Sequence, residues 1–318
     1  MNVLITGCVG FIGSHVCEAL LRDGNQVWGL DNLTAAASFA PDQKADNVAL
    51  LQQYENFHFV SGDVRDTAVL QSIWQECGPD RVVHLAHCTG VRASIENPVL
   101  FCDVNLTGTA QVLEKARLAK TPVVIGSSAA VYGRGARVPH REDDAAAQPA
   151  SPYGATLRAA ELLASTYHYL YDFPLVCLRF FTVYGPRQRT NGAFGEFSRA
   201  VLHDEQAALH GDGTTARDFC YVDDAVRAIV TALERAPQFG FEIINVGGGR
   251  VVELRRLLEV LEKAAGRRAK IEWRPDQRGG VRVTCADLSL ARALLNFEPQ
   301  VSLEDGARRT IEWMRESR

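Results

Sequence analysis

The chain has 318 residues, of which 47% are hydrophobic and 23% are charged, and its formal net charge is −4. These values predict a folded globular protein with a main domain and a smaller one. The charge balance, with no basic run, argues against nucleic acid as the main partner, and no apolar stretch reaches the roughly 20 residues that cross a bilayer. The first residues enter an expected strand at once, which predicts no signal peptide and a cytoplasmic location.

The chain begins with a strand, a glycine-rich turn and a helix. The apolar run 2–5 predicts a buried strand, and it leads into Gly7, Gly10 and Gly13, with a helix expected over 11–22. Gly7 permits a tight turn, Gly10 lets the backbone approach a pyrophosphate, and Gly13 lets helix and strand pack closely. A pyrophosphate would lie over the helix N-terminus, where N–H groups and the helix dipole favour anions.

A second strand, expected over 26–30, ends on Asp31. It lies roughly 20 residues past the glycines, where an acidic side chain binds a ribose 2′-hydroxyl. Because a carboxylate would repel a 2′-phosphate, the pattern predicts NAD rather than NADP. The alternative is a glycine-rich turn that binds no ligand, but both strands, the helix and the terminal acid all occur at the expected spacing.

Short apolar runs alternate with helical stretches through the first 180 residues. This alternation predicts an α/β fold of the doubly wound (Rossmann) type, with a parallel sheet covered on both faces. The segment 33–50 has no clear period and is expected to form an irregular surface excursion. The remaining strands are expected over 57–60, 81–85, 121–125 and 174–180, and the remaining helices over 66–76, 98–119 and 153–171.

After residue 186 the alternation gives way to short mixed segments. We therefore expect residues 1–185 to form the dinucleotide-binding domain, with 224–248 returning to it, and residues 186–318 to form a smaller, interleaved substrate domain. The expected C-terminal elements are helices over 224–235, 252–265, 288–296 and 303–316, and strands over 241–246 and 271–273.

The eight cysteines form no C-x-x-C pair and most lie in apolar runs, which predicts buried reduced thiols. His84 and His87 flank a strand end without other metal-ligand residues beside them. We expect them to be structural or cofactor-lining side chains, and we expect no metal site.

Polar residues follow most of the expected strands, and in an open parallel sheet ligands bind beyond these carboxyl ends. Tyr153 begins a helix whose first turn can reach the same edge. A tyrosine, with an ordinary pKa of about 10, becomes a useful base when a nearby cation favours the phenolate, and Leu157 stands one helical turn later. The residues after the strands are Asp63 and Val64, which can meet an adenine, then Ala86 and His87, Ser127 and Ser128, and Thr182.

The chain resembles the extended short-chain dehydrogenase/reductase family, specifically its NAD-dependent nucleotide-sugar epimerases, and it is most similar to UDP-glucuronate 4-epimerases. The resemblance covers nearly the full length. It rests on GCVGFIGSH, the pair Asp31–Asn32, HLAHCTGVRASIENP, SSAAVYG, SPYGAT, RFFTVYGPRQR and GDGTTARDFCYVDD.

The resemblance implies an isomerase that inverts carbon 4 of a UDP-sugar, UDP-glucuronate to UDP-galacturonate, through a 4-keto intermediate and with bound NAD. Tyr153, assisted by Ser128, would take the proton from the 4-hydroxyl. Dehydratase relatives carry an Asp–Glu pair where this chain has Ala129 and Ala130, so elimination of water lacks its acid and base. A homodimer through the helices 98–119 and 153–171 is also implied, and a UDP-hexose 4-epimerase is an alternative.

Residue roles follow from the same resemblance. Arg189 matches the position that meets the sugar carboxylate, which a planar guanidinium suits; the alternative is a surface arginine. Thr182 also resembles the glucuronate branch, and Arg217 fits a diphosphate-binding arginine. The implied catalytic residues are Tyr153, Ser128 and Ser127; the cofactor-binding residues are Gly7, Gly10, Phe11, Ile12, Gly13, Asp31, Asn32, Asp63, Val64, Leu85, Ala86, His87, Asn105 and Tyr153; the substrate-binding residues are Arg92, Ser128, Thr182, Arg189, Arg217 and Gln277.

Leu157 departs from the family pattern, which has a lysine at this position. A cation about 5 Å away, at an effective dielectric near 20, would stabilise the Tyr153 phenolate by about 3 kcal/mol. Without this cation, the pKa of Tyr153 is expected to be higher and proton abstraction to be about a hundredfold slower. Arg158 is expected to point away from Tyr153. Three interpretations stay open: an epimerase with a weakened or rearranged base, a non-catalytic protein that binds NAD and a sugar nucleotide, and an ordinary epimerase silenced by an introduced leucine.

Overall fold

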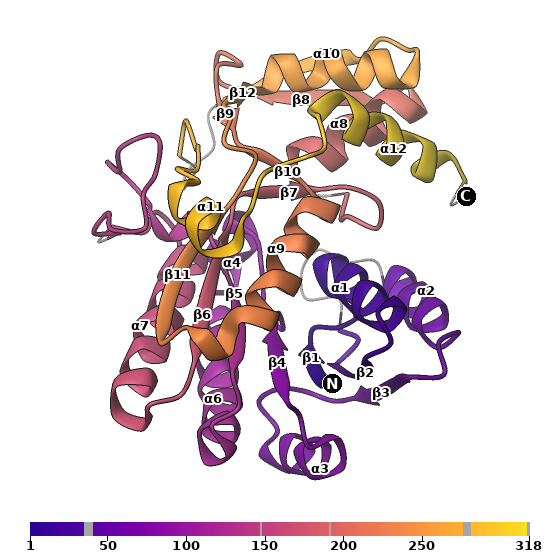
Figure 1. The fold of residues 1–318 in the computed structure, drawn as a ribbon. Coiled ribbons are helices and arrows are strands. Elements are labelled where there is room, and N and C mark those ends of the chain that lie inside the picture. The colour runs from indigo at the N-terminus through magenta and orange to yellow at the C-terminus, as the bar shows by residue number, and fades with distance from the viewer. Residues whose placement is uncertain (35–40, 147, 191, 276–280, 317–318) are drawn as a thin grey trace.

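The computed structural model describes residues 1–34, 41–146, 148–190, 192–275 and 281–316. At its centre lies a seven-stranded sheet whose neighbouring strands are all parallel, in the order β3-β2-β1-β4-β5-β6-β11 (Figure 1). This is the doubly wound fold that the alternation predicts, and the strand order reverses between β1 and β4. The strands are β1 (Asn2–Thr6), β2 (Gln26–Asp31), β3 (Phe57–Ser61), β4 (Arg81–His84), β5 (Val123–Ser128), β6 (Leu175–Phe180) and β11 (Phe241–Val246).

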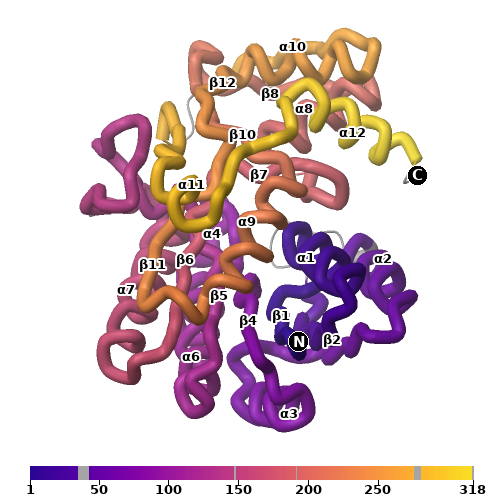
Figure 2. The backbone as a smooth tube through the Cα atoms, viewed as in Figure 1, coloured from indigo at the N-terminus to yellow at the C-terminus, as the bar shows by residue number. Residues whose placement is uncertain are grey.

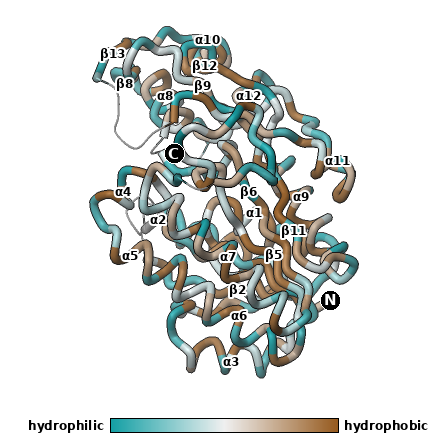
Figure 3. Tube along the Cα trace, turned by 90° about the vertical axis from the view of Figure 1, so that its left-hand side faces the viewer, coloured by the Kyte–Doolittle hydropathy of each residue, from teal (hydrophilic) through white to brown (hydrophobic). Residues whose placement is uncertain are grey.

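Helices cover both faces of the sheet because successive strand residues point to opposite sides. On β1, Val3 and Ile5 belong to the apolar cluster under α1 and α9, whereas Leu4 belongs to the cluster under α3, α6 and α7. In Figure 3 the strands β5, β6 and β11 are mostly hydrophobic, as strands buried on both faces must be. The helices are α1 (Phe11–Arg22), α3 (Thr67–Cys77), α6 (Gly108–Ala119), α7 (Pro152–Tyr171) and α9 (Val222–Arg235).

The helix expected over 98–119 consists of three pieces. A five-residue π-helical turn, Asp103–Thr107, separates α5 (Pro98–Cys102) from α6, and the short α4 (Val91–Glu96) precedes α5. Pro98 starts α5 at its first position, which suits a residue without an N–H. Single π-helical turns are often found at functional sites, and this one carries Asn105.

The segment 33–50 was expected to be irregular, but its second half is a helix, α2 (Pro41–Leu51). The inner face of α2 is short: Leu51 is fully buried, and Asn47 donates a hydrogen bond from Nδ2 to the carbonyl oxygen of Val9 at 2.9 Å. Too few apolar positions recur for a helical period to show in the sequence. The prediction failed because a polar contact does part of the packing.

The chain beyond residue 186 builds most of a smaller layer above the sheet, where the segments 193–210, 254–274 and 303–316 lie together (Figure 2). The expected strand at 241–246 is β11, which pairs with β6 in the main sheet. The expected strand at 271–273 pairs with β8, which the sequence analysis did not predict. The elements here are β7 (Thr182–Tyr184), α8 (Ala193–His203), β8 (Gln206–His210), β9 (Ala216–Arg217), β10 (Phe219–Tyr221), β12 (Val252–Glu253), α10 (Leu254–Ala265), β13 (Lys270–Arg274), α11 (Ser289–Leu295) and α12 (Leu303–Glu316).

Among the helices that the structure describes, none has the length and apolar character that a bilayer crossing requires.

A buried ion pair ties α7 to the sheet. Glu161 on α7 and Arg179 on β6 have side chains that are each 1% exposed, and two hydrogen bonds of 2.8 Å join them. Ser127 at the end of β5 donates a hydrogen bond to the same carboxylate at 2.7 Å. Because α7 also carries Tyr153, this contact fixes the helix that presents Tyr153 to the sheet edge.

Replacing Glu161 by glutamine is expected to lower the free energy of unfolding by about 3 kcal/mol or more, because the Arg179 charge stays buried without its counter-ion. Urea unfolding followed by circular dichroism measures the change. Glu259→Gln, which breaks an exposed pair with Arg256, is the control and should stay within experimental error. An E161Q chain that unfolds at the same urea concentration as the unmodified chain would refute the role of this pair.

Candidate active site

A cavity of about 590 Å³ lies at the carboxyl ends of the strands, around the point where the strand order reverses between β1 and β4. Open α/β sheets bind ligands at such a point. Most of the lining residues come from the turns that follow the strands, with Tyr153 and Leu157 contributed by α7. The lining segments include 10–13, 30–32, 62–65, 85–89 and 126–128.

The turn between β1 and α1 leaves no room for side chains. Gly7 has φ +73°, and a Cβ atom on Gly13 would lie 2.1 Å from the carbonyl oxygen of Gly7. Gly10 precedes the first helical residue, and no side chain in the described part of the chain caps this helix N-terminus. The N–H groups at the start of α1 therefore face the cavity, as an anion such as a pyrophosphate requires.

Asp31 lines the cavity at the end of β2 and is buried. Its Oδ1 accepts hydrogen bonds from the N–H of Leu33 at 2.9 Å and from Lys44 Nζ at 2.7 Å. Both contacts use Oδ1, so a ribose hydroxyl would bind at Oδ2. Lys44 on α2 was not singled out in the sequence, because it lies in the segment without a clear period.

A second carboxylate lines the cavity beside the first. Arg65 binds Asp63 through a hydrogen bond of 2.9 Å to Oδ1 and one of 2.8 Å to Oδ2, and Asn32 Nδ2 donates to Oδ2 at 2.8 Å. These hydrogen bonds hold the pKa of Asp63 well below its ordinary range, so the side chain stays ionised and fixed. The side chain of Asp63 is thus occupied by protein partners, which leaves its backbone and Val64 to meet an adenine.

Two histidines lie near the end of β4, one behind the cavity wall and one in it. His84 contacts the hydroxyl groups of Thr6 at 2.7 Å and Thr109 at 3.0 Å, and His87 contacts Thr109 at 3.2 Å. Burial lowers the pKa of His84, and it lowers the pKa of His87 to about 4, so both rings are neutral near pH 7. Only His87 lines the cavity. Among the described residues no cluster of side chains could hold a metal ion.

Asn105 does not line the cavity. Its side chain is fully buried and bonds to the backbone of Cys88, accepting from the N–H at 2.7 Å and donating to the carbonyl oxygen at 3.0 Å. A further hydrogen bond of 3.0 Å reaches Thr156 on α7. Asn105 therefore fixes the wall at Cys88, and the cofactor contact that the resemblance implies stays a prediction.

Tyr153 lies in the first turn of α7 and lines the cavity together with Ser128. Ser151 caps this turn by accepting a hydrogen bond from the N–H of Gly154 at 3.2 Å. Burial raises the pKa of Tyr153, while a hydrogen bond with Ser128 and the charge of Arg189 oppose that rise. These are the surroundings of a phenol that is able to exchange a proton with a bound ligand.

Of the two serines at the end of β5, Ser128 lines the cavity with Tyr153 and lowers the pKa of that phenol. Ser127 donates its hydroxyl proton to Glu161, as described above, which makes it a structural partner of the buried ion pair. Its hydroxyl therefore points to a carboxylate inside the protein, although Ser127 was expected to be catalytic.

Arg189 lies in the segment that follows β7 and donates a hydrogen bond from Nη2 to Thr89 Oγ1. Both residues line the cavity, and Thr89 is a residue that the sequence analysis did not single out. The two are a hundred positions apart in the chain. Arg189 therefore lines the cavity, and its role toward a sugar carboxylate stays a prediction.

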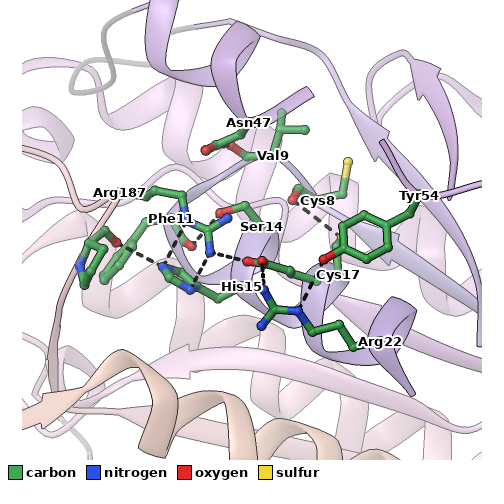
Figure 4. A network of polar contacts seen from close by, with 12 residues as sticks. Cys8, Val9, Phe11, Ser14, His15, Cys17, Arg22, Asn47, Tyr54 and Arg187 are labelled. Carbon is green, nitrogen blue, oxygen red and sulfur yellow. Dashed lines mark hydrogen bonds and ion pairs between the residues drawn. The ribbon is translucent and has the colours of Figure 1, made fainter. Parts of the chain in front are cut away.

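The segment that carries Arg189 is tied to α1. Figure 4 shows Arg187 against His15, with 2.6 Å between Arg187 Nη2 and His15 Nδ1, and Nη2 also binds Glu18 at 2.7 Å. Burial and the neighbouring guanidinium lower the pKa of His15 to about 4, so it is neutral near pH 7. The helix at the glycine turn and the segment that carries Arg189 are thus joined directly.

Three of the expected substrate residues that the structure describes do not line this cavity. Arg92 lies on α4 with its side chain 86% exposed and pairs with Glu96, because its position on a short surface helix turns it outward. Arg217 donates to the carbonyl oxygens of Ala216 and Arg282 at 2.9 and 3.2 Å. Thr182 and Arg217 are not among the residues that line the cavity, and Gln277 lies outside the described residues.

The parallel sheet, the glycine turn, the acidic residue after β2 and the tyrosine on α7 define a dinucleotide-dependent enzyme of the doubly wound class. The chain belongs to the NAD dependent epimerase/dehydratase family, whose model matches residues 3–247.

The curated proteins and solved structures that are similar to this chain include sugar-nucleotide epimerases. A UDP-glucuronate 4-epimerase from Thermodesulfobacterium geofontis is 39% identical, over 99% of this chain and 96% of that protein. The crystal structure of UDP-glucuronic acid 4-epimerase from Bacillus cereus, in complex with UDP-glucuronic acid and NAD, has a TM-score of 0.93 and 35% identity and covers 100% of both chains. UDP-glucose 4-epimerase from Thermotoga maritima, with UDP-glucose, has a TM-score of 0.91 and 31% identity over 100% of this chain and 99% of that one.

The glycine turn gives a test of the cofactor cradle. Gly13→Ala is expected to lower both the melting temperature and NAD affinity, because the new methyl group would overlap the Gly7 carbonyl. Gly10→Ala, whose Cβ would lie 3.2 Å from the same oxygen, should fold normally and lose NAD affinity. Thermal unfolding and calorimetric titration with NAD measure both effects. Unchanged NAD affinity in both variants would contradict the assignment of the turn.

Proposed function

We propose that the chain is an NAD-dependent epimerase that interconverts UDP-glucuronate and UDP-galacturonate at carbon 4. The observation that carries the proposal is one cavity that combines the glycine turn, Asp31, the Ser128–Tyr153 pair and Arg189. Membership of the family and the names of the similar proteins support the same reaction.

The residues at the cavity fit NAD. The glycine turn leaves space where a Cβ would otherwise project, the start of α1 offers N–H groups to the pyrophosphate, and Asp31 suits the adenosine ribose. When bound, NAD supplies the acceptor and donor of hydride. The protein holds the cofactor and the sugar in one orientation and excludes water from the reacting carbon.

Tyr153 and Ser128 move the proton. In the first half-reaction the phenolate of Tyr153 takes the proton from the 4-hydroxyl of the sugar as carbon 4 loses hydride, which gives a 4-keto sugar. After the keto sugar turns over, hydride returns to its other face and Tyr153 returns the proton. Ser128 stabilises the phenolate form of Tyr153 through its hydrogen bond.

Arg189 favours a substrate with a carboxylate. A guanidinium inside a cavity binds a carboxylate through two parallel hydrogen bonds and would be left without that partner by a neutral hexose. A UDP-hexose 4-epimerase is the alternative, and the similarity to the Thermotoga maritima UDP-glucose 4-epimerase is what favours it.

A second candidate function is binding without turnover. Leu157 favours it, because the side chain is 2% exposed, belongs to the apolar core and offers Tyr153 no charge. In this case the chain would hold NAD and a sugar nucleotide but would not invert carbon 4.

The proposed reaction is tested by incubating the chain with UDP-glucuronate and NAD and separating the UDP-sugars by ion-exchange chromatography. UDP-galacturonate is expected to form, and Tyr153→Phe should slow its formation at least about a hundredfold while NAD affinity is retained. Faster inversion of UDP-glucose than of UDP-glucuronate would favour the hexose alternative. No inversion of either sugar, with NAD and UDP-glucuronate both bound, would favour the binding function.

We infer that residues 1–185 with 224–248 hold the cofactor and that the rest of 186–318 holds the sugar nucleotide; the place of β11 in the main sheet supports this division.

All eight cysteines are described and unpaired, and seven of them are buried, which supports a reducing compartment such as the cytoplasm.

We also infer a homodimer that forms through the helices between residues 98 and 119 and through α7. The outer face of α7 exposes Leu162, Tyr169 and Leu170 at 53%, 85% and 59%, and Val99 on the neighbouring α5 is 79% exposed. Large apolar side chains repeated along one helix face at this exposure are typical of a surface that a second copy covers.

Leu162→Asp is expected to shift the chain from dimer to monomer, because a buried carboxylate without a partner opposes association. Light scattering coupled to size-exclusion chromatography measures the mass. Val251→Asp, at an exposed apolar residue beside β12 and far from α7, is the control and should keep the mass of the unmodified chain. A monomeric mass for the unmodified chain would overturn the inferred dimer.

A further inference from the structure

One buried hydroxyl group determines where two histidines carry their protons. Thr109 on α6 has a single O–H proton, and its Oγ1 lies 2.6 Å from the carbonyl oxygen of Asn105, which can only accept. The same Oγ1 lies 3.0 Å from Nε2 of His84 and 3.2 Å from Nε2 of His87. Because the hydroxyl proton is donated to Asn105, each imidazole must donate an N–H to Oγ1, which has two lone pairs to accept them.

The surroundings of His84 agree with this assignment. A neutral imidazole that carries its proton on Nε2 accepts at Nδ1, and Nδ1 of His84 lies 2.7 Å from the hydroxyl oxygen of Thr6. This oxygen accepts the N–H of Ala86 at 3.3 Å, so the hydroxyl proton of Thr6 is available for Nδ1. His84 is fully buried and therefore uses both ring nitrogens inside the protein.

His87 differs from His84, because among the described residues only its Nε2 has a hydrogen-bond partner. Burial lowers the pKa of His87 to about 4, so near pH 7 the ring carries one proton, on Nε2, and Nδ1 is an acceptor. His87 lines the cavity, and its Nδ1 is not one of the described side-chain atoms that are sealed inside the protein without a partner, as both ring nitrogens of His140 are. The acceptor is therefore open to the cavity.

The strand order indicates which part of a dinucleotide passes this nitrogen. In the order β2-β1-β4-β5, Asp31 ends β2, the glycine turn follows β1, and Ser128 ends β5. A dinucleotide with its adenosine ribose at Asp31 and its pyrophosphate over the glycine turn must pass the end of β4 before its nicotinamide reaches Ser128 and Tyr153. The group between the pyrophosphate and the nicotinamide is the second ribose, and His87 lies in the loop after β4.

Helix α7 offers this ribose few polar atoms. The described α7 residues that line the cavity are Tyr153 and Leu157, and the leucine side chain has no polar atom. Thr156 beside them is buried, accepts a hydrogen bond from Asn105 Nδ2 at 3.0 Å and donates to the carbonyl oxygen of Tyr153 at 3.0 Å. A ribose hydroxyl that is removed from water here needs an acceptor on another element, because a hydroxyl without a partner weakens binding.

We propose that His87 is a cofactor-binding residue that accepts a hydrogen bond at Nδ1 from a hydroxyl group of the nicotinamide ribose. The inference rests on the NAD site of the proposed function and goes beyond it by naming the atom, the tautomer and the ribose. Thr109 and the ring of His84, whose centroid lies 4.6 Å from that of His87, hold the imidazole in one orientation. The acceptor is thus preorganised, which lowers the entropy cost of binding.

Two substitutions of His87 separate its two nitrogens. The side-chain amide of asparagine places an oxygen near the position of Nδ1, whereas that of glutamine reaches the position of Nε2 and leaves no acceptor at the δ position. His87→Gln is therefore expected to weaken NAD binding about tenfold, and His87→Asn to keep the affinity within about twofold of that of the unmodified chain. Calorimetric titration of the full chain with NAD measures both affinities, and melting temperatures compare the folding of the two variants.

NAD analogues that lack one hydroxyl of the nicotinamide ribose identify the group that is bound. The analogue without the contacted hydroxyl should bind the unmodified chain about tenfold more weakly than NAD does. It should bind His87→Gln and the unmodified chain with equal affinity, because the partner of Nδ1 is then missing in both cases. NAD without the 2′-hydroxyl of the adenosine ribose, which is assigned to Asp31, is the matched control and should keep the tenfold difference between the two chains. A tenfold difference that persists with every analogue would overturn the inference.

Nitrogen-15 spectra of the imidazoles test the tautomer in the unmodified chain, with the His87→Gln spectrum used to assign the resonances. His87 is expected to carry its proton on Nε2, and the Nδ1 resonance should move when NAD binds. Thr109→Val removes the acceptor of the Nε2 proton and should produce a mixture of both tautomers. A proton on Nδ1 in the unmodified chain would refute the inference.

These measurements need no turnover, so they are independent of the reaction that the chain catalyses. Loss of affinity that depends on both His87 and one ribose hydroxyl, in a chain that does not invert UDP-glucuronate, would refute the proposed reaction and leave the role of His87 in place. Inversion of UDP-glucuronate by a chain in which His87→Gln binds NAD normally would do the opposite.

Discussion

The close contact of Gly13 with the carbonyl oxygen of Gly7 determines where α1 begins, and the rest of the site is built around that point. Any side chain at Gly13 would push the helix away from the end of β1. With the helix in place, its first N–H groups face the cavity between β1 and β4. Its outer side then offers His15 and Glu18 to Arg187. One backbone contact thus positions both the anion-binding end of the helix and the loop across from it.

Charge is distributed unevenly along the cavity. At the end near β2 and β3, Lys44 pairs with Asp31, and Arg65 is shared by Asp63 and Asp103. Behind the cavity, Glu161 on α7 binds both Arg179 on β6 and Arg158, and the contact with Arg179 anchors α7. At the end near Tyr153, Leu157 makes the helix side apolar, and Arg189 from the loop after β7 lines the same cavity. A reaction that creates and removes charge on a phenol oxygen is sensitive to this asymmetry.

Sequence patterns predicted the sheet well because each central strand is a continuous apolar run that ends at a turn, and burial on both faces requires such runs. They predicted α1 and α7 for the same kind of reason. They failed for α2, where Asn47 and Leu51 make the inner contacts and no repeated apolar stripe exists. The π-helical turn at 103–107 was also not predicted, because it depends on the contact of Asn105 with a distant loop.

The sequence predicted the site residues whose position depends on the backbone conformation. It predicted less well those whose position depends on the direction of a side chain. The glycines, Asp31 and Tyr153 lie at the cavity as expected. Arg92 and Asn105 have the implied residue types, but α4 turns the first outward and the loop at Cys88 engages the second. Lys44 and Thr89 reach the site from distant parts of the chain, and no local pattern identifies partners of this kind. The role of a residue in a family therefore does not predict the side-chain rotamer that this residue adopts in one member of the family.

The link between Arg187 and α1 has a consequence for how ligands influence each other. His15 and Glu18 lie one to two turns into the helix whose N-terminus lines the cavity, and Arg187 is two residues from Arg189, which lines the same cavity. The end of the cavity that is expected to bind the dinucleotide and the end that is expected to bind the sugar are therefore joined by one rigid connection. By thermodynamic reciprocity, a dinucleotide that steadies this connection would tighten sugar-nucleotide binding by the same factor by which the sugar nucleotide would tighten dinucleotide binding.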